Sequence, residues 1–457
     1  MGFEAEGQTP PPGCPAHGAP GPVPLWGPEF AADPHQIYSH LRSMGAAAPV
    51  EVAPGVPVTL VTGYTAARSV LQDPRRFVRD SDRWEAYHNG GIPHDSPVLQ
   101  LILKRQNAMF ADGQEHVRLR QALTDSLNQI DTYTLRKRVD QIGEYLINRF
   151  CQDGKVDLIP EYARKLPLLV FAYLFDCPQE VGDRLITGIS DLFDGRDAHN
   201  ANNMLVGALM DLVALKRRSP GDDLVSWLIG HPNGLTDAEM VQQLVLLVGG
   251  GTEPIQNLMS SALCRLLDDR SVRVDEAINA VLWNDPPIAN YAIHYPVTDV
   301  EVEGSRLKAN SPVMISFAAA NADPALAEAQ SSAKRAHLAW GAGPHACPAK
   351  DWAHVIYEAG IERLLKRLPD IELAVPASGL YWRPGAFQRA LAELPTRFTP
   401  VAPVDARPAA AAPSSTPLPQ SAPLVGRPAE PQRTPAPTQP QRRKGLWGAL
   451  ADWLQGK

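Results

Sequence analysis

Residues 337–350 read His-Leu-Ala-Trp-Gly-Ala-Gly-Pro-His-Ala-Cys-Pro-Ala-Lys, and a helix-like run begins directly after them. Gly341 and Gly343 can adopt backbone angles that are closed to other residues, so this loop can turn back tightly against a flat surface. Cys347 would then lie just before a helix N-terminus, where free N–H groups and the helix dipole favour a thiolate. The stretch therefore predicts a thiolate presented by a glycine-rich loop.

A thiolate held in such a loop is what a haem iron needs as an axial ligand. Two other interpretations remain. A single cysteine among glycines is often only a small, buried apolar residue. A zinc ion could instead be held by four side chains of this region, namely His337, His345, Cys347 and His354. No paired Cys-x-x-Cys motif supports zinc, so we favour haem ligation.

Composition limits the class of protein. At 457 residues and 44% hydrophobic content, the chain can bury one large core or two ordinary ones. The formal net charge of −7 gives no reason to expect a nucleic-acid partner. The five cysteines are scattered and odd in number, which argues against a disulfide framework and fits a reducing cytoplasm. The start of the chain lacks the features of a signal peptide, and no run of about 18 apolar residues could span a membrane.

The chain divides by composition. Residues 1–24 are rich in proline and glycine and are expected to lack fixed structure. Residues 25–400 form the folded part, in which helical periodicity dominates 130–270 and short strands are expected near both ends. The fold class is therefore mainly α with small β-sheets. Residues 401–440 contain 11 prolines in 40 positions and predict an extended linker.

Residues 240–258 predict a buried helix with an unusual centre. They begin with mostly apolar side chains and continue with Gly-Gly-Gly-Thr-Glu-Pro at 249–254. Each of three consecutive glycines costs a helix about 1 kcal/mol relative to alanine, so a close approach must compensate. Pro254 lacks an N–H and crowds the carbonyl of Gly250, which predicts a bend and an opened groove. Glu253 would lie inside that groove.

These stretches together resemble cytochromes P450. Residues 340–349 are similar to the aromatic-Gly-x-Gly-x-His-x-Cys-x-Gly loop of that family, with Trp340 for the usual phenylalanine and Ala349 for the last glycine. The resemblance implies a P450 fold over about 25–400, haem b as the cofactor and Cys347 as its iron ligand. The other loop residues that it implies in haem binding are Trp340, Gly341, Gly343 and His345.

Two further segments are implied to bind the haem propionates. His116 and Arg120 lie four residues apart, share a helix face and match the His-x-x-x-Arg pair with which P450s bind a propionate. The alternative for this pair is a solvated basic helix face. Residues 293–304 resemble the strand where P450s place another propionate-binding arginine. That position holds His294, which would bind only when protonated or as a neutral donor.

The buried helix resembles the P450 helix that carries Ala/Gly-Gly-x-Asp/Glu-Thr, whose groove holds dioxygen. Gly250, Gly251 and Glu253 match in register, whereas Pro254 replaces the threonine whose hydroxyl steers protons in the family. Glu253 is the implied proton relay through water. Thr252 is a candidate substitute for the missing hydroxyl, although it should point to a different helix face. The alternative is that the glycines and proline serve packing only.

The helix before Pro286-Pro287 departs from the family. Ala280 and Trp283 stand where P450s carry a Glu-x-x-Arg pair, and Arg335 is an uncertain substitute for the third member of that network. Replacing both members of a buried ion pair by apolar groups can be neutral, which predicts repacking around Trp283. The chain is similar here to a subgroup of actinobacterial P450s found beside operons that encode a sensor-kinase-like membrane protein and a small GTPase-like protein.

The resemblance implies a haem-thiolate monooxygenase that inserts an oxygen atom into a small organic substrate. Electrons would come from a separate ferredoxin-type partner, since the chain has no flavin or nucleotide domain. The competing hypothesis is a haem-binding regulator or scaffold of a membrane-associated signalling complex with little turnover, which Pro254 and the C-terminal tail favour. We favour the enzyme, because the chemistry of such proteins belongs mainly to the cofactor.

The end of the chain, residues 441–457, predicts an amphipathic helix beside the basic cluster at 442–444. Its apolar stripe at helical spacing consists of Leu446, Trp447, Leu450, Trp453 and Leu454. Such a short helix is marginal alone in water. It could lie on a membrane surface, where each basic residue adds roughly 1 kcal/mol near anionic lipid, dock in the groove of a partner protein, or fold back on its own domain.

Overall fold

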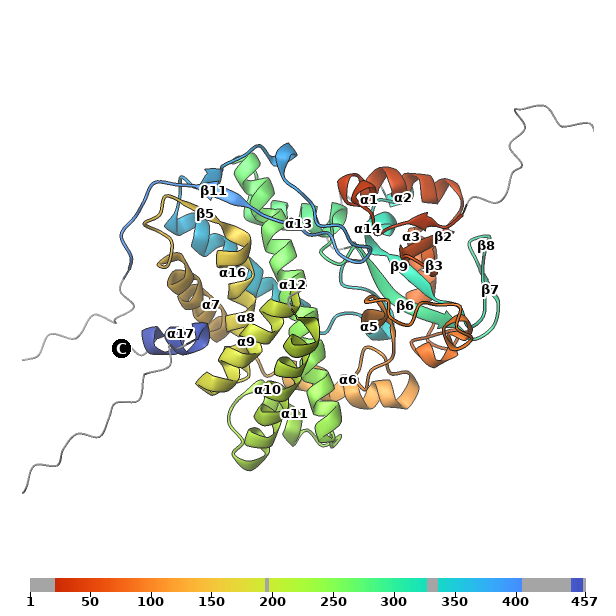
Figure 1. Ribbon diagram of the computed structural model, residues 1–457, viewed down its shortest axis with the longest axis horizontal. Helices are drawn as coiled ribbons and strands as arrows, with labels where there is room; N and C mark the ends of the chain where they lie inside the picture. The colour runs from red at the N-terminus through yellow and green to blue at the C-terminus, as the bar shows by residue number, and fades with distance from the viewer. Residues whose placement is uncertain (1–20, 194–196, 327–335, 405–444, 455–457) are drawn as a thin grey trace, which may run out of the picture.

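The computed structural model describes residues 21–193, 197–326, 336–404 and 445–454. The long helix α12 (Asp237–Asp268) crosses the molecule, with most other helices on one side of it and the largest β-sheet on the other (Figure 1). The fold is mainly helical with small sheets, as predicted.

The helical part forms a core around α12. Its other members are α6 (Gly113–Leu127), α7 (Thr132–Ile147), α8 (Lys165–Leu174), α9 (Gln179–Phe193), α10 (Ala198–Arg218), α11 (Leu224–Gly230), α13 (Val274–Asn284) and α16 (Lys350–Arg367). Helix α8 is apolar around nearly its whole circumference, and accordingly it is buried between α7 and α12. Helix α16, which follows the cysteine loop, packs against both α7 and α12.

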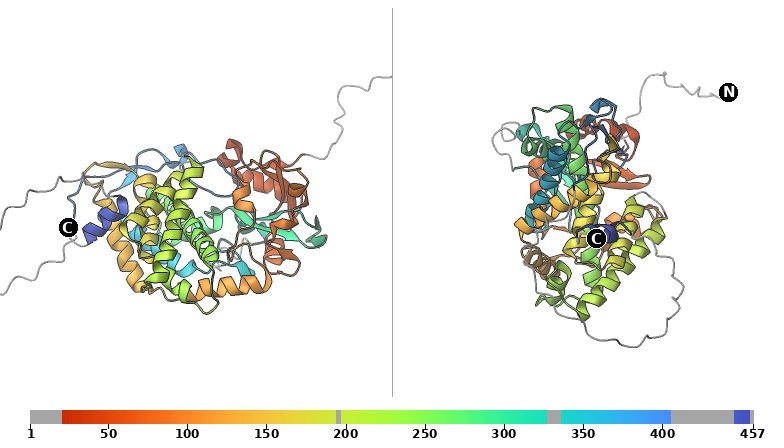
Figure 2. Two further views of the ribbon diagram at one scale, coloured as in Figure 1. Left: turned by 60° about the horizontal axis from the view of Figure 1, so that its bottom comes forward. Right: turned by 90° about the vertical axis from the view of Figure 1, so that its left-hand side faces the viewer.

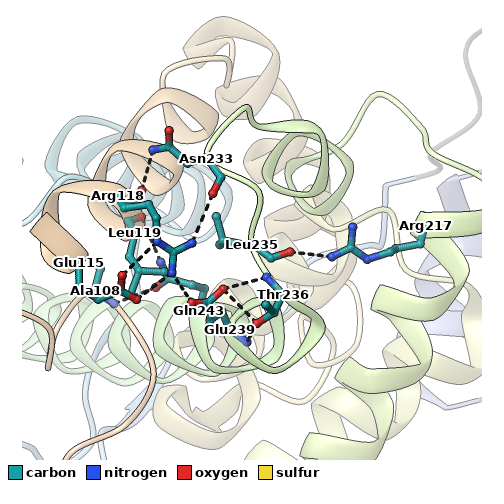
Figure 3. A network of polar contacts seen from close by, with 10 residues as sticks. All are labelled: Ala108, Glu115, Arg118, Leu119, Arg217, Asn233, Leu235, Thr236, Glu239 and Gln243. Carbon is teal, nitrogen blue, oxygen red and sulfur yellow. Dashed lines mark hydrogen bonds and ion pairs between the residues drawn. The ribbon is translucent and has the colours of Figure 1, made fainter.

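The start of α12 is tied to α6, the helix that carries His116 and Arg120. Thr236 and Glu239 form a capping box at the N-terminus of α12, so the orphan N–H groups of its first turn are satisfied. Arg118 of α6 contacts Glu239, and the buried Gln243 side chain donates to the Leu119 carbonyl at 3.1 Å (Figure 3). These contacts set where α6 stands relative to α12.

Helix α12 runs without a break through the glycines at 249–251 and through Pro254. The bend predicted at Pro254 therefore does not interrupt the helix. The close approach that the glycines require is present at Gly251, where an added Cβ would overlap the ring of Phe171 in α8. Glycine thus allows α8 and α12 to pack at close range.

The largest sheet has the strand order β1-β2-β3-β9-β6-β4. Its strands are β1 (Val23–Pro24), β2 (Ala47–Ala53), β3 (Val56–Val61), β9 (Val313–Ser316), β6 (Asn290–Pro296) and β4 (Phe77–Val78). Strands β2 and β3 form an antiparallel hairpin. Strand β4 pairs antiparallel with β6, with Val78 opposite Tyr295, so the next residue, Arg79, is carried toward His294.

The remaining elements are short. Near the large sheet are α1 (Pro28–Ala32), α2 (Pro34–Ser43), α3 (Tyr64–Leu71), α4 (Glu85–His88), α5 (Leu99–Ile102) and α14 (Phe317–Asn321). The two smaller sheets consist of β5 (Lys155–Asp157), β10 (Glu372–Leu373) and β11 (Pro395–Arg397), and of β7 (Val300–Val302) and β8 (Ser305–Leu307). In the described part of the chain, no helix is long and apolar enough to cross a membrane.

The described part of the chain includes ordered residues that precede the predicted range of 25–400. Val23 and Pro24 pair with Val50 and Glu51, so ordered structure begins before residue 25. Residues 1–20 and most of the predicted linker, 405–444, lie outside the described residues.

The C-terminal helix α17 (Leu446–Leu454) lies against α9 and α7 of its own chain (Figures 1 and 2). This is the third of the three alternatives for the tail. Four side chains of the apolar stripe that we considered for a membrane surface or a partner's groove pack on the protein itself, namely Leu446, Trp447, Leu450 and Trp453.

Candidate functional site

The cysteine loop has the tight geometry that its glycines predict. Gly341 and Gly343 both have φ of +69°, in the left-handed region, and the Cys347 N–H donates to the Trp340 carbonyl at 2.8 Å. A Cβ on Gly343 would overlap the carbonyl oxygen of Leu71 at the end of α3. The loop is thus pressed against α3, and the position accepts only glycine.

We expect Gly343→Ala to destabilise the protein by about 3 kcal/mol, because it combines a left-handed backbone strain with a steric overlap in a packed region. Gly341→Ala is the matched control. It has the same φ, but its nearest neighbour would be the Ala346 Cα at 3.7 Å, so it should cost only about 1 kcal/mol. Urea unfolding of both variants measures the difference, and equal losses would contradict the close packing at Leu71.

A cavity of about 250 Å³ lies between the cysteine loop and α12. The loop contributes Cys347 and α12 contributes Gly250, Gly251 and Pro254, so the predicted residues of both segments meet at one site. The walls are mostly apolar. They include Leu71, Ala108, Met109, Leu123, Leu246, Leu247, Ile255, Leu258, Leu282, Ile288, Phe317, Trp340 and Trp352.

A cluster of basic side chains stands at the cavity without an acidic partner among its lining residues. Arg79, Arg120 and His345 line the cavity, and the His116 ring lies 4.0 Å from the ring of His345. The Nε2 atom of His116 and the Nε atom of Arg79 are buried and have no hydrogen-bond partner among the described residues. Burial lowers the pKa of Arg79 to about 10, and burial beside Arg79 lowers the pKa of His345 to about 2. Such a cluster calls for an anionic ligand.

Arg79 is the residue that sequence analysis missed. It is buried, its guanidinium donates to the Ile293 carbonyl at 3.0 Å, and its backbone N–H donates to the Asp112 carboxylate at 2.8 Å. The only signal in the sequence was an arginine directly after a short apolar segment. That this arginine reaches the cavity depends on the pairing of β4 with β6, which the spacing of residues in the sequence does not reveal.

His294 does not line the cavity, contrary to the role we assigned to it. Its ring is buried, Nδ1 lies 2.6 Å from the Ala292 carbonyl oxygen, and burial holds its pKa well below the ordinary value. A charged imidazolium is therefore disfavoured at this position. The cation that lines the cavity near His294 is the side chain of Arg79.

Thr252 and Glu253, the two proton-relay candidates, do not line the cavity either. The Thr252 hydroxyl donates to the Val248 carbonyl at 2.7 Å within its own helix. Both carboxylate oxygens of Glu253 are engaged, by Arg383 at 2.9 Å and by Gln388 at 2.8 Å. The α12 residues on the cavity wall, all within the described residues, carry neither a hydroxyl nor an acid. The glycines that we predicted in the groove thus lie on the cavity wall, whereas these two side chains do not.

The Cys347 thiol is held in surroundings that favour its neutral form. Burial raises its pKa above the ordinary value, and the Ala349 N–H and the positive charges of Arg120 and Lys350 only partly oppose this effect. The thiolate that we predicted from the helix N-terminus is thus not the preferred state of the isolated protein. A bound cation would displace the proton, as metal ions do at cysteine ligands.

The alternative zinc ligands are dispersed. The His337 ring packs edge-to-face on Trp283, with centroids 5.7 Å apart, and the His354 ring lies 2.6 Å from the Tyr357 hydroxyl. Within the ranges that the structure describes, no group of three or more His, Cys, Asp or Glu side chains could hold a metal ion together. The geometry therefore does not support zinc.

Trp283 and Asn321 pack behind the cysteine loop, where the Glu-x-x-Arg network was expected from the family. Trp283 is buried against His337, and Asn321 is fully buried beside it. The Asn321 side chain donates to the Leu282 carbonyl at 3.1 Å and accepts from the Leu338 N–H at 2.7 Å. It thereby joins α13 to the start of the cysteine loop, a role that we did not predict. Arg335, the uncertain substitute, lies outside the described residues.

We expect His337 to make the protein less stable in mild acid. Burial, with a smaller contribution from Lys350, lowers its pKa to about 4. Below pH 6.5 the imidazole of His337 binds a proton in the unfolded chain but stays neutral in the folded protein. The free energy of unfolding therefore falls as the pH drops from 6.5 toward 4. Between pH 7 and 5 the wild type should lose about 1 to 2 kcal/mol more than His337→Gln in urea unfolding. The exposed His40→Gln is the control, and parallel curves for all three proteins would exclude His337 as the cause.

The site fits haem. A flat apolar cofactor with two carboxylates needs apolar walls, a thiolate on one face and cations at one edge, and the cavity offers all three. Cys347 would ligate the iron, and Arg79, Arg120 and His116 would face the carboxylates. The fold and the site therefore fit the class of mainly helical proteins built around a thiolate-ligated haem.

Comparison with known proteins identifies the family. No protein-family model matches the chain. The chain is 30% identical over 348 residues to cytochrome P450 105C1 of a Streptomyces species, covering 71% of this chain and 85% of that one. It is 29% identical over 369 residues to 2-hydroxy-5-methyl-1-naphthoate 7-hydroxylase of Streptomyces carzinostaticus, covering 75% and 90%. The solved structure of CYP154C4 from Streptomyces sp. ATCC 11861 superimposes with a TM-score of 0.74 at 28% identity, covering 82% and 98%. The chain belongs to the cytochrome P450 family of haem monooxygenases and is an oxidoreductase.

Proposed function

We propose that this protein uses haem b, ligated by Cys347, to insert an oxygen atom into a small organic substrate. The observation that carries the proposal is the single cavity in which Cys347, the α12 glycines and the basic cluster meet. When bound, the haem supplies activation of dioxygen, and its thiolate ligand donates electron density to the iron.

The chain's own residues position the cofactor and shape the pocket. Gly250 places no side chain on the α12 wall, which leaves room there for a flat ligand, whereas the missing side chain of Gly251 makes room for the Phe171 ring of α8. Arg79, Arg120 and His116 bind and orient its carboxylates. The apolar walls contributed by α6, α12 and the segment around Met109 favour a mostly apolar substrate and exclude water from it.

Electrons come, in this proposal, from a ferredoxin-type partner in the cytoplasm. Two basic residues near the cysteine loop are candidates to attract such a partner, Lys350 and Arg118. Lys350 is exposed at the start of α16, directly after the loop. Arg118 is engaged by Glu115 and Glu239, so it contributes less free charge. An exposed lysine at this position would attract an acidic protein.

A second candidate function has one observation in its favour. The α12 wall carries no hydroxyl or acid, because Pro254 takes the threonine position and Glu253 is held by Arg383 and Gln388. Slow proton delivery suits a haem-binding regulator or scaffold of a membrane-associated signalling complex. The chain also resembles the actinobacterial subgroup that carries tryptophan in place of the Glu-x-x-Arg pair and is found beside operons for a sensor-kinase-like and a GTPase-like protein.

Two measurements separate these functions. The reduced, CO-bound absorption spectrum of the purified holoprotein should show the red-shifted Soret band of a thiolate ligand, and a haem-loaded protein without that band would exclude both functions. Turnover with a ferredoxin system is then compared with turnover driven by peroxide, for the wild type and Pro254→Thr. An enzyme should turn over with ferredoxin in the wild type. A regulator should turn over substrate slowly with the ferredoxin system and with peroxide. Only its Pro254→Thr variant should gain activity.

A further inference from the structure

One polar side chain continues the apolar stripe with which α12 lines the cavity. Leu246, Leu247, Gly250 and Pro254 lie on the cavity wall, and Gln243 extends the same helix face at a spacing of three and four residues. The Gln243 side chain is fully buried. A buried amide is tolerated only where its polar atoms are hydrogen-bonded, so the partners of Gln243 indicate what the side chain does.

The two ends of the Gln243 amide bind backbone groups of two different segments (Figure 3). Its Nε2 donates to the Leu119 carbonyl of α6 at 3.1 Å, and its Oε1 accepts from the Ala108 N–H at 3.2 Å. Ala108 belongs to the irregular segment between α5 and α6, where neither a helix nor a strand supplies an acceptor for its N–H. The amide of Gln243 therefore joins this segment to α6.

Both of the joined segments contribute side chains to the cavity. Ala108 and Met109 line it, and so does Arg120, which directly follows Leu119. The Met109 N–H donates to the Oδ1 atom of Asn107 at 3.1 Å, and the Asn107 side chain is buried as well. Buried amides thus hold the wall at residues 108 and 109 on one side and the helix of Arg120 on the other. A shift of either segment would change the shape of the cavity.

We propose that Gln243 is a positioning residue that fixes the wall at Ala108 and Met109 relative to the Arg120 side chain. Gln243 is not among the residues that line the cavity, so it acts through the two segments that its amide joins. The inference rests on the proposed function, in which Arg120 binds a haem carboxylate. Because that contact ties the cofactor to α6, the Gln243 amide sets the space between the cofactor and the wall. This space determines which apolar ligands fit.

The first test replaces the amide by an apolar side chain of the same length. Gln243→Met leaves the Ala108 N–H unpaired, because a thioether is a poor hydrogen-bond partner. Ferric holoprotein is titrated with phenylimidazole, which binds iron and extends into the cavity, and with imidazole, which binds iron alone. Phenylimidazole should lose about tenfold in affinity, whereas imidazole should change by less than about twofold. The ratio of the two affinities reports the position of the wall.

The second test uses Gln243→Glu and a pH profile that a merely structural side chain would not produce. A protonated carboxyl group can donate to the Leu119 carbonyl and accept from the Ala108 N–H, as the amide does. The ionised carboxylate can only accept, so it repels the Leu119 carbonyl. Burial raises the pKa of a carboxyl group. The affinity ratio of Gln243→Glu should therefore equal that of the wild type near about pH 6 and approach that of Gln243→Met near about pH 9.

The matched control is Gln242→Met on the same helix. The side-chain oxygen of Gln242 has no hydrogen-bond partner among the described residues, and its backbone carbonyl, which accepts from the Asn107 side chain at 3.5 Å, is retained in the variant. Gln242→Met should bind both probes as the wild type does. If Gln243→Met takes up no haem, Gln243→Glu carries the test, because it retains both hydrogen bonds when protonated.

Three outcomes would overturn the positioning role of Gln243. They are equal losses of both probes in Gln243→Met, wild-type binding of phenylimidazole by that variant, and an affinity ratio of Gln243→Glu that does not change with pH relative to the wild type. A lower stability of Gln243→Met in urea with an unchanged ratio belongs to the second outcome and would show that the amide only supports the fold. Failure of the proposed function is seen separately, as a wild-type holoprotein without the thiolate band in its CO-bound spectrum.

Discussion

Cys347→Ser should abolish the red-shifted Soret band of the reduced, CO-bound protein and lower turnover by roughly a thousandfold, which corresponds to about 4 kcal/mol of activation barrier. Serine keeps the size of the side chain but is a much poorer donor of electron density to iron. The loop itself should survive, because its shape depends on Gly341, Gly343 and the Cys347 backbone N–H.

The control for this experiment is Cys264→Ser. Cys264 is a partly buried thiol of α12 that does not line the cavity, so its replacement should leave both the spectrum and turnover unchanged. Retention of the thiolate band by Cys347→Ser, or its loss in Cys264→Ser, would assign the iron ligand elsewhere. Haem content measured beside the spectrum distinguishes a changed ligand from a lost cofactor.

Arg79→Gln should release haem about a hundredfold to a thousandfold faster than the wild type. A carboxylate held at a partly buried site loses about 3 to 4 kcal/mol when its cationic partner is removed, because the remaining charge is left unpaired. Haem transfer to an excess of apomyoglobin measures the rate without reference to catalysis. The exposed Arg83→Gln, four residues further along the chain, should release haem at the wild-type rate.

Two additional readouts separate a haem ligand from a merely structural arginine. The haem-free form of Arg79→Gln should be as stable as the haem-free wild type or more stable, since a buried cation with an unpartnered Nε is costly on its own. Because β4 and β6 bring position 79 toward position 294, adding His294→Arg to Arg79→Gln should recover part of the lost haem affinity. Loss of apoprotein stability without faster haem release would show that Arg79 only supports the fold.

The sequence predicted the parts of the site whose residues are adjacent in the chain. The cysteine loop, the α12 glycines and the His116/Arg120 pair each consist of residues within a few positions of one another. The structure places Cys347, the glycines and Arg120 on one cavity, with the His116 ring against that of His345. The sequence did not predict Asn321, Arg383 or Gln388, which act through partners 17 to 135 residues away. We predicted an unpaired Glu253 in the groove because its partners, Arg383 and Gln388, belong to a segment that carries no recognisable motif.

The sequence by itself determined the fold class, the resemblance to the family and the cysteine loop that contributes Cys347 to the cavity. Periodicity, capping residues and glycines act over one or two turns, so their consequences can be deduced from neighbouring residues. Only the tertiary structure decided which cations line the cavity, which α12 side chains reach it and where the C-terminal helix lies. Strand register placed Arg79 near His294, helix packing turned Thr252 and Glu253 away, and the missing side chain of Gly182 in α9 left room for Trp447. Each outcome depends on contacts between segments far apart in the chain, and no local pattern encodes such a contact.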